Sequence, residues 1–422
     1  MSNKNQPSRR AFLKAGAITA GSAALSAKSH AQVSGANERL NLGIIGCGSI
    51  ATSHLGALQS LVEKDNIAIT WVCDVFKKRA GEFAGRIKSE GGKARATGDY
   101  RKVLDDPDLD YVLIATPEHS HHYLVMAALK AGKHVYCEKP LCYDIREAKE
   151  VVQEAARTGL KLQVGVQGMS DDSYATAQDA IRAGKIGTVV EAQIDYLLNK
   201  DLQQGPWRLA TLPEEKKPRG LNWEDWLKPR SKRPWNPHHY FEWRCYRDYS
   251  GGIATDLFVH RITRIIRACG LTFPTRAAGL GGIYTWDDGR DVPDSLEVLL
   301  EYPAVEGITK GMTVHLLGTS ANKYGSPHCI RGKDATLVFT RAGWDIVSED
   351  SGEVVESHEK TGGEDLRLHH MNHHDAIRTG ARLKCPPELG LYGVVASRMG
   401  NLSWFKKKMV AWDPKKQRVV VS

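Results

Sequence analysis

A glycine-rich turn near the start of the chain constrains the fold more than any other feature of the sequence. Residues 46–51 read GCGSIA; they follow a short apolar run, residues 42–45, and open a segment with helical periodicity, residues 50–61. A turn of this GxGxxA form between a strand and a helix is typical of the first βα unit of a dinucleotide-binding sheet. The sequence therefore predicts a doubly wound α/β domain at this end of the chain.

Each position of this turn suits the binding of a nucleotide. Gly46 allows the tight turn, Gly48 lets the backbone approach a pyrophosphate, and Ala51 allows the helix to pack closely on the strand. Ser49 and Ile50 open the helix, whose N-terminus attracts phosphate groups. We therefore predict that Gly46, Gly48, Ser49 and Ile50 contact a dinucleotide cofactor.

An acidic residue follows the second predicted strand, residues 67–72. Asp74 can bind the hydroxyls of the adenosine ribose, and its charge would repel a 2′-phosphate, so the sequence predicts NAD. Lys77, Lys78 and Arg79 come shortly afterwards and could instead hold the 2′-phosphate of NADP. We expect them to form the solvated start of a helix, which leaves NAD preferred and NADP possible.

The order of elements divides the chain into two domains. Apolar runs alternate with helical stretches over residues 40–163, which is the pattern of a Rossmann-type parallel sheet, whereas long strand candidates dominate residues 164–422. We therefore expect a dinucleotide-binding domain and then an α+β domain with a large, mostly antiparallel sheet that serves substrate binding and oligomerisation. The predicted strands are residues 42–45, 67–72, 111–115, 134–136, 160–164, 188–198, 276–286, 296–302, 309–317 and 336–340. The predicted helices are residues 50–61, 77–90, 120–131, 145–158, 173–183, 253–269, 366–379 and 389–407.

The first 31 residues resemble an export signal. Residues 8–14, SRRAFLK, precede a mild apolar stretch, residues 15–27, and a small-x-small cleavage site at residues 29–31. This order is typical of a twin-arginine signal peptide, a route that carries folded proteins, and a basic tail is the alternative. The prediction is that residues 1–31 direct the folded protein to the Tat export machinery and are removed, which leaves an N-terminal arm, residues 32–39, on a periplasmic or otherwise exported protein.

The charge and cysteine content exclude several classes of protein. The net charge is +9, but beyond the first 31 residues the chain carries 53 basic against 49 acidic residues, with no basic block. This argues against a nucleic-acid partner. A composition of 41% hydrophobic and 25% charged residues excludes a disordered or polytopic membrane protein. Eight cysteines without a CxxC pair predict neither a disulfide framework nor a zinc site, and we expect Cys47, Cys73 and Cys137 to be core thiols.

Two motifs carry a resemblance to a known family. Residues 115–121 read ATPEHSH and residues 131–141 read AGKHVYCEKPL. Together they resemble the glucose-fructose oxidoreductase / inositol dehydrogenase (Gfo/Idh/MocA) family. The resemblance extends over roughly residues 40–422, because residues 251–260 match the family's GG…D…H segment and residues 372–380 match its N…DAIRxG helix.

The resemblance implies a Rossmann domain, an open-faced sheet, and hydride transfer between a nicotinamide and a sugar or polyol carbon. It implies that Lys139 lies beside substrate and nicotinamide, on a Lys139–Pro140 bond that is often cis in the family. It also implies that Asp256 and His260 orient the substrate hydroxyl and exchange its proton. The cofactor-binding residues that it implies in the two motifs are Thr116, Pro117, His121, Glu138 and Lys139.

The residue types support this chemistry without the resemblance. Oxidation of a secondary alcohol releases a proton, and a histidine with a pKa near neutrality suits its removal. A lysine beside the same oxygen would stabilise the developing alkoxide. Asp256 and His260 are four residues apart and would share one face of a helix. That face could equally be solvated, since Thr263, Arg264 and Arg267 continue it, but the match to the family motif favours the catalytic interpretation.

The segment 200–250 holds five of the ten tryptophans, with several tyrosines. Aromatic rings suit the apolar faces of sugars, but a long loop also needs large side chains as anchors. We expect most of these aromatic residues to be anchors and one or two to line the site. The candidate substrate-binding residues here and elsewhere are Gln167, Trp235, His238, His239, Tyr240, Arg244 and His369.

Four histidines form two i,i+4 pairs near the C-terminus, at positions 369, 370, 373 and 374. Such a pair could bind a metal. No HExxH motif and no carboxylate as a third ligand accompany them, so we predict no metal site. Contact with substrate or with the neighbouring domain is the interpretation that we favour.

These features together predict an exported NAD(P)-dependent oxidoreductase that acts on a secondary hydroxyl of a sugar, polyol or glycoside. A free nicotinamide pool is scarce outside the cytoplasm, so we expect a tightly bound cofactor. We also expect a homo-oligomer, either a dimer or a tetramer. One alternative is a glycosidase that oxidises, eliminates and reduces again with a recycled bound NAD. Another is a non-catalytic sugar- or nucleotide-binding protein on the same fold, against which Lys139, Asp256 and His260 argue.

Overall fold

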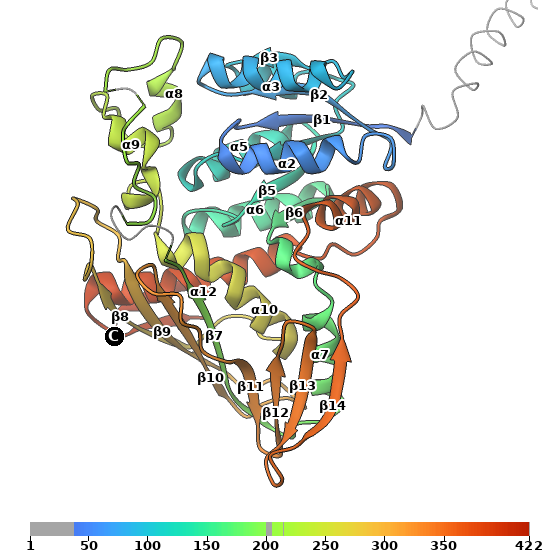
Figure 1. Cartoon of the computed structure of the whole chain (residues 1–422), viewed down its shortest axis with the longest axis vertical. Coiled ribbons are helices and arrows are strands. Elements are labelled where there is room, and N and C mark those ends of the chain that lie inside the picture. The colour runs from blue at the N-terminus through green and yellow to red at the C-terminus, as the bar shows by residue number, and fades with distance from the viewer. Residues whose placement is uncertain (1–37, 200–204, 214, 422) are drawn as a thin grey trace, which may run out of the picture.

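The computed structural model describes residues 38–199, 205–213 and 215–421. A six-stranded sheet with its helices forms one end of the molecule, and a ten-stranded sheet forms the other (Figure 1). The predicted twin-arginine signal and most of the predicted arm lie outside the described residues. Within them, every helix is too short or too polar to cross a membrane.

The six-stranded sheet is parallel and doubly wound, as predicted, with the strand order β3-β2-β1-β4-β5-β6. Its strands are β1 (Leu40–Ile45), β2 (Ile67–Cys73), β3 (Arg95–Thr97), β4 (Tyr111–Ile114), β5 (His134–Glu138) and β6 (Leu162–Gly165). Its helices are α2 (Ser49–Gln59), α3 (Lys77–Ser89), α4 (Tyr100–Leu104), α5 (His121–Lys130) and α6 (Ile145–Thr158). The strand order reverses between β1 and β4, and open α/β sheets bind their ligands at such a switch point.

Local sequence explains why these elements form. All four residues of β4 and of β6 are buried, as expected for short apolar strands covered by helices on both faces. Helix α6 begins at a capping box, in which Asp144 and Glu147 satisfy backbone N–H groups of the first turn. It ends at Gly159, whose φ of +69° suits a residue without a side chain.

The ten-stranded sheet has the order β14-β13-β12-β11-β7-β10-β9-β8-β15-β16 and is antiparallel except for the β7–β10 pair. This confirms the predicted mostly antiparallel sheet. Its strands are β7 (Val189–Leu197), β8 (Arg276–Gly282), β9 (Ser295–Tyr302), β10 (Met312–Thr319), β11 (His328–Gly332), β12 (Ala335–Phe339), β13 (Gly343–Ser348), β14 (Val354–Glu359), β15 (Val410–Asp413) and β16 (Arg418–Val421).

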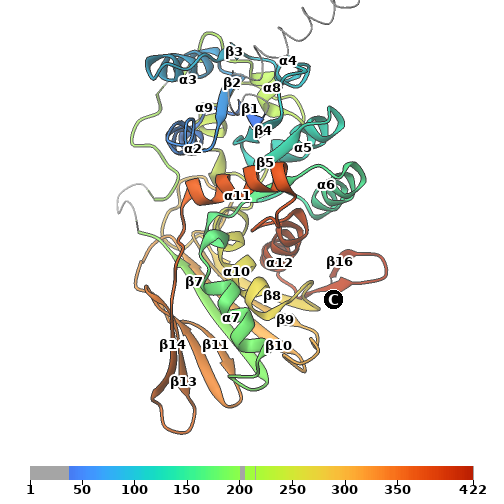
Figure 2. The same ribbon diagram turned by 90° about the vertical axis from the view of Figure 1, so that its right-hand side faces the viewer.

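Helices cover one face of this sheet (Figure 2). They are α7 (Ser173–Arg182), α10 (Val259–Cys269) and α12 (Pro387–Lys406), and α11 (Leu366–Thr379) lies between this layer and the six-stranded sheet. Along β9 and β10 buried residues alternate with more exposed ones, because only one face is covered. On β8 and β9 the uncovered face presents Leu280 and Leu299, which are 79% and 48% exposed.

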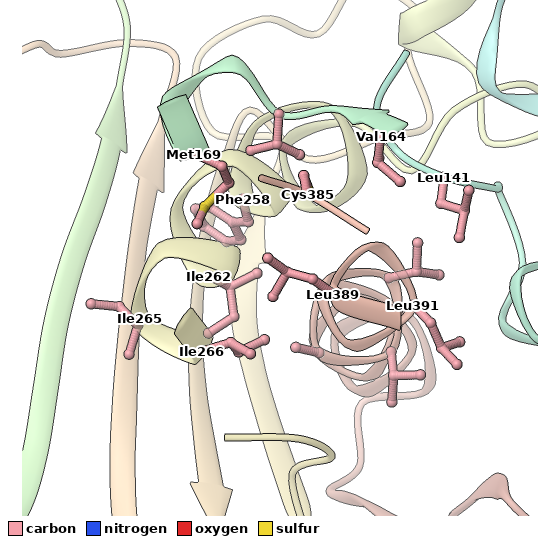
Figure 3. Close-up of a cluster of buried hydrophobic side chains, with 14 of the residues drawn as sticks. Leu141, Val164, Met169, Phe258, Ile262, Ile265, Ile266, Cys385, Leu389 and Leu391 are labelled. Atoms are coloured by element: carbon pink, nitrogen blue, oxygen red, sulfur yellow. The ribbon is translucent and has the colours of Figure 1, made fainter. Parts of the chain in front are cut away.

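One hydrophobic core connects the two sheets. Figure 3 shows Ile262 and Ile266 of α10 facing Leu389 of α12, with Leu141 and Val164 of the six-stranded domain beside the same helix. These side chains belong to a single cluster of buried residues that reaches from β4 and β5 to β9 and β10. The crevice at the switch point of the first sheet is therefore fixed relative to α10.

The predicted helix over residues 253–269 is wrong in one respect, because it consists of two parts. Residues Ile253–Phe258 form a π-helical turn, η5, and α10 follows from Val259. The segment predicted as loop-like, residues 200–250, contains two short helices, α8 (Trp223–Leu227) and α9 (Pro237–Phe241). All eight cysteines are buried free thiols.

Candidate active site

The glycine turn between β1 and α2 has the geometry that the motif predicts. Gly46 has a φ of +94°, and a Cβ on it would lie 2.7 Å from the carbonyl oxygen of Ala115, so only glycine fits. The backbone N–H of Cys47 donates to Asp74 at 2.8 Å, which ties the turn to the end of β2. The turn and the predicted ribose-binding acid are thus one unit.

Gly48 leaves the N-terminus of α2 open. It is the N-cap residue, no side chain caps the helix, and a Cβ on Gly48 would have no atom within 4 Å. The first N–H groups of α2 therefore point into unobstructed space, and such groups with the helix dipole bind phosphate. This cradle fits the pyrophosphate of a dinucleotide.

Asp74 is buried, and both carboxylate oxygens already accept hydrogen bonds. One accepts from the N–H of Cys47 and the other from the N–H of Phe76, at 2.7 Å. Burial raises the pKa of Asp74, while the charge of Arg79 and the two amide bonds oppose the rise. Each oxygen keeps a further lone pair, so the carboxylate can still accept ribose hydroxyls.

A cavity of about 370 Å³ lies along this turn, within the usual size range of ligand sites. It contains most of the predicted cofactor-binding residues and two of the predicted substrate-binding residues. Those that line it are Gly46, Gly48, Ser49, Ile50, Asp74, Thr116, Pro117, Tyr240 and Arg244. His121, Glu138 and Lys139 do not line it; His121 lies behind the wall, 2.8 Å from the carbonyl oxygen of Thr116 and 2.7 Å from that of Pro140.

Lys139, Asp256 and Arg244 form a charged cluster in which Asp256 is buried, and Arg244 also lines this cavity. The Nζ of Lys139 donates to the Asp256 carboxylate at 2.7 Å and to the Asp256 carbonyl oxygen at 2.8 Å. The Nε of Arg244 donates to the same carboxylate oxygen at 3.1 Å. Although burial alone would raise the pKa of Asp256, these two cations hold it well below its usual range. Arg244 therefore joins the cluster to the dinucleotide cavity.

Glu138 fixes the backbone that carries Lys139. It is 3% exposed, and one of its oxygens accepts from the Nε2 of Gln167 at 2.6 Å and lies 2.9 Å from the Nε2 of His54. Its other oxygen accepts from the N–H of Lys139 at 3.1 Å. Burial would raise the pKa of Glu138, but His54 lowers it to about 2. The Lys139–Pro140 bond is cis, as the resemblance implied.

His260 lies one turn after Asp256, in the first turn of α10. Its Nδ1 is buried and has no hydrogen-bond partner within the described part of the chain. Burial and the charge of Lys139 lower the pKa of His260 to about 3. The expectation of a pKa near neutrality is therefore not met, because a buried imidazole beside an ammonium group disfavours a second positive charge. The ring is therefore neutral at pH 7.

Gly251 and Gly252 directly precede the π-helical turn η5, which carries Asp256. Gly252 has a φ of +62°, and a Cβ on it would lie 2.8 Å from the Cβ of Val292. π-Turns of this kind are often found at functional sites. Here the turn places the carboxylate of Asp256 toward Lys139 rather than on the outer surface of a regular helix.

Glu118 is a site residue that the sequence reasoning did not single out. Its buried carboxylate accepts hydrogen bonds from the hydroxyls of Ser250, at 2.5 Å, and Thr255, at 2.7 Å. Burial and the nearby charge of Asp256 raise the pKa of Glu118. The signal available in the sequence was its place directly after Thr116 and Pro117, at the end of the β4 strand.

Five candidate substrate residues lie away from the cavity wall, and one of them is Gln167, which donates to Glu138. The indole N–H of Trp235 donates to the carbonyl oxygen of Glu215 at 2.9 Å. His238 lies 2.7 Å from Glu242, and His239 lies 3.0 Å from the hydroxyl of Tyr249. The two ring nitrogens of His369 lie against Ser170 and the carbonyl oxygen of Val164, so this side chain is used within the interior.

The histidines of α11 join this helix to the six-stranded domain. His370 Nε2 lies 2.8 Å from His54 Nδ1, and His374 Nε2 lies 2.6 Å from the hydroxyl of Tyr111. His374 is also paired with Asp65. Over the described residues there is no group of three or more His, Cys, Asp or Glu side chains that could hold a metal. These histidines serve the contact between domains, which is one of the two roles expected for them.

Comparison with known proteins agrees with this geometry. Residues 40–166 match a family model described as the Gfo/Idh/MocA oxidoreductase family with an NAD-binding Rossmann fold. The inositol 2-dehydrogenase/D-chiro-inositol 3-dehydrogenase of Lactiplantibacillus plantarum is 33% identical over 147 residues, which are 35% of this chain and 41% of that protein. The inositol 2-dehydrogenase of Rhodococcus jostii is 33% identical over 161 residues, 38% of this chain and 42% of that protein. The chain thus spans less than half the length of these curated relatives.

Solved structures share the whole fold at low sequence identity. A levoglucosan dehydrogenase in complex with NADH superposes with a TM-score of 0.68 at 19% identity, over 88% of this chain and 99% of that one. The WlbA dehydrogenase of Bordetella pertussis, in complex with NADH and UDP-GlcNAcA, gives a TM-score of 0.64 at 15% identity, over 89% and 99%. At this identity the likeness establishes the two-sheet fold. The segment that forms the first sheet, residues 40–166, belongs to the Gfo/Idh/MocA oxidoreductase family with its NAD-binding Rossmann fold.

Proposed function

We propose that the chain as a whole belongs to this family and is an exported, NAD-dependent oxidoreductase. It transfers a hydride between a secondary hydroxyl of a sugar, polyol or glycoside and the nicotinamide. The inositol dehydrogenases among its relatives support a cyclitol or sugar as the substrate class.

One observation carries the proposal. Arg244 lines the cavity that fits a dinucleotide and also donates to Asp256, which is paired with Lys139. Residues from both domains thereby link the cofactor cavity to a cluster that can act on a hydroxyl group. Sequence motifs alone do not establish this link, because Arg244 lies in neither of the family motifs.

Each side chain of the cluster has a chemical role. Bound NAD supplies the hydride acceptor. His260, neutral at pH 7, is the candidate base for the proton of the substrate hydroxyl. The ammonium group of Lys139 stabilises the negative charge that develops on the same oxygen. Asp256 orients that ammonium group, and Glu138 holds the backbone of Lys139.

A glycosidase with a recycled NAD is a second candidate. The observation that favours it is that aromatic residues from outside the six-stranded domain cover the cofactor cavity, as Trp226, Tyr240 and Trp243 line it. An enclosed cofactor suits a reaction in which oxidation and reduction occur in one active site. The experiment described next distinguishes the dehydrogenase from the glycosidase.

The test is cofactor identification followed by a substrate panel. Mass spectrometry of the small molecules released from denatured, purified protein should detect NAD. Sugars, cyclitols and nitrophenyl glycosides are then added, and absorbance at 340 nm and aglycone release are recorded together. Accumulating NADH supports a dehydrogenase, whereas aglycone release without net NADH supports the glycosidase. Neither a cofactor nor any turnover would leave only the binding-protein alternative.

Export and oligomerisation are further parts of the proposal. Replacing Arg9 and Arg10 with lysine should keep folded protein in the cytoplasm if the twin-arginine signal is used; export of this variant would refute the signal. Leu280 and Leu299 support a homo-oligomer, because they expose apolar area on the uncovered sheet face. Sedimentation of the purified protein should show a dimer or tetramer, and a monomer would contradict this.

A further inference from the structure

A segment of the second domain lies against the nucleotide-binding face of the first. We define the insert as residues 205–213 and 215–249, which include α8 and α9. Figure 1 shows α8 and α9 beside the six-stranded domain, well away from the ten-stranded sheet. We propose that the insert forms the wall that binds the adenosine half of the cofactor and slows its release. This inference rests on the proposed NAD-dependent function.

The insert is bonded to the backbone that follows Asp74. The N–H of Asn222 donates to the carbonyl oxygen of Val75 at 2.9 Å, and the N–H of Lys77 donates to that of Gly220 at 3.1 Å. Phe76 and Leu221 form the antiparallel bridge between these bonds. The insert is therefore hydrogen-bonded to the backbone that directly follows Asp74, the predicted ribose-binding acid.

A second attachment lies on the other side of the switch point. His119 follows β4, is completely buried, and lies 2.8 Å from the carbonyl oxygen of Trp226. Its ring packs edge-on against Trp226 and Tyr249, with centroids 4.9 and 5.1 Å away. The insert thus contacts the loops after both β2 and β4, which flank the crevice where a dinucleotide binds.

Between these attachments the insert presents flat side chains to the cavity. Trp226, Tyr240, Phe241 and Trp243 line it together with Asp74. Arg79, from α3, also lines it, and its guanidinium group lies 5.3 Å from the centroid of the Tyr240 ring. Aromatic rings and guanidinium groups stack on flat heterocycles, and an adenine attached to a ribose held by Asp74 is such a group.

The insert also has its own small core. Phe76 of the first domain packs in one cluster with residues of the insert, Tyr249 among them, and this cluster is separate from the two larger cores. The other buried members are Leu221, Trp223, Trp226, Leu227 and Tyr240. A unit with its own small core can open locally as one body. Release of the cofactor would require this opening, which is why we expect release to be slow.

Release kinetics test the inference without any substrate. The full-length protein is loaded with NADH and mixed with excess NAD, and the loss of NADH fluorescence gives the release rate. Tyr240→Ala should release NADH at least about tenfold faster, the effect of losing one stacking contact. Tyr240→Phe is the matched control; it keeps the ring and should release NADH at the wild-type rate. Arg79→Met removes the guanidinium group that lies over the Tyr240 ring, and it should also accelerate the release of NADH.

The outcomes separate this inference from the proposed function. Equal release rates for wild type, Tyr240→Ala and Arg79→Met would overturn the inference while NADH binding itself supports the function. Failure of the wild-type protein to bind either NADH or NADPH would instead overturn the function. If Tyr240→Ala does not fold, as judged by circular dichroism, Arg79→Met decides the question, because Arg79 lies outside the insert core.

Discussion

Two adjacent residues, Glu138 and Lys139, face different surroundings at the end of β5. Glu138 points into the interior, where it meets His54 and Gln167, whereas Lys139 reaches across to Asp256 on the second domain. Successive residues of a strand point to opposite sides, so one residue can support the backbone while its neighbour acts in the site. Removing Glu138 would therefore act on Lys139 through its main chain.

His260→Ala should slow the chemical step. Loss of a general base lowers the rate by a factor on the order of 10² to 10⁴. The measurement is single-turnover reduction of bound NAD by the best substrate of the panel. Cofactor binding should stay unchanged, because the glycine turn and Asp74 are untouched. A near-normal rate in His260→Ala would show that another group removes the proton.

Asp74 should make the protein prefer NAD over NADP. Its carboxylate is fixed by the N–H groups of Cys47 and Phe76 and cannot turn away from a 2′-phosphate. The structure separates the three basic residues that could compensate: Lys77 and Lys78 are exposed, and Arg79 alone lines the cavity. Titration of both cofactors into the apoprotein, followed by intrinsic fluorescence, measures the preference. Tighter binding of NADP would mean that Arg79 outweighs Asp74.

At the scale of elements, the π-helical turn η5 depends on a partner in the other domain. Glu118→Ala should destabilise the protein by about 1–3 kcal/mol, because it leaves the buried hydroxyls of Ser250 and Thr255 without their acceptor. Urea unfolding monitored by circular dichroism measures this. Glu118→Gln retains an acceptor oxygen and should lose less. Equal stability of Glu118→Ala and wild type would show that these hydrogen bonds contribute nothing.

The elements with a strong periodic signal were predicted well. Residues 366–379 form α11 with the predicted bounds, and five of the six strands of the first sheet lie within a few residues of those expected, whereas β3 was not predicted. The missed strands lack such a signal. β14 is mostly exposed and carries charged residues, and β11 and β16 are only five and four residues long. β14 and β16 are the two edge strands of the ten-stranded sheet, and an edge strand is held by its single neighbour's backbone, which its own sequence does not show.

The residues of the candidate site also fall into those that the sequence could predict and those that it could not. The glycine turn, Asp74 and Lys139 lie in continuous motifs and could be predicted from the sequence. Arg244 reaches Asp256 from twelve residues earlier in the same domain but lies in neither motif, and Glu118 of the first domain comes near Asp256 only through the packing of the two domains. The aromatic density of the insert was visible in the sequence, but its contact with the Rossmann domain was not.

At the scale of the whole molecule, α11 joins the C-terminal part of the chain to the first domain. Asp65 is paired with His374 and accepts a hydrogen bond from Arg378 at 2.9 Å. Although burial would raise the pKa of Asp65, these partners lower it. The pair therefore stabilises the fold above the unfolded-state pKa of about 4, and this stabilisation is lost as the pH falls below it.

Asp65→Asn should test this pH dependence. At pH 7 the variant should lose about 1.5–3 kcal/mol of unfolding free energy, the contribution of hydrogen bonds to a charged group. The difference from wild type should shrink as the pH is lowered through the unfolded-state pKa of about 4 toward the lowered pKa of the folded protein, because the unfolded chain then binds a proton at Asp65 more readily than the folded protein does. Urea unfolding at each pH gives both free energies. A difference that is independent of pH would exclude the ion pair as its cause.

The position of α11 has a consequence for synthesis on the ribosome. The buried rings of His54, Tyr111 and Tyr136 in the first domain contact histidines of α11, more than two hundred residues later in the chain. Until residue 374 has left the exit tunnel, these rings lack the partners that α11 supplies, although the strands around them have already been synthesised. The nascent dinucleotide-binding half therefore remains incomplete through most of translation. The nucleotide-binding half can therefore complete its packing only after nearly the entire polypeptide has been synthesised.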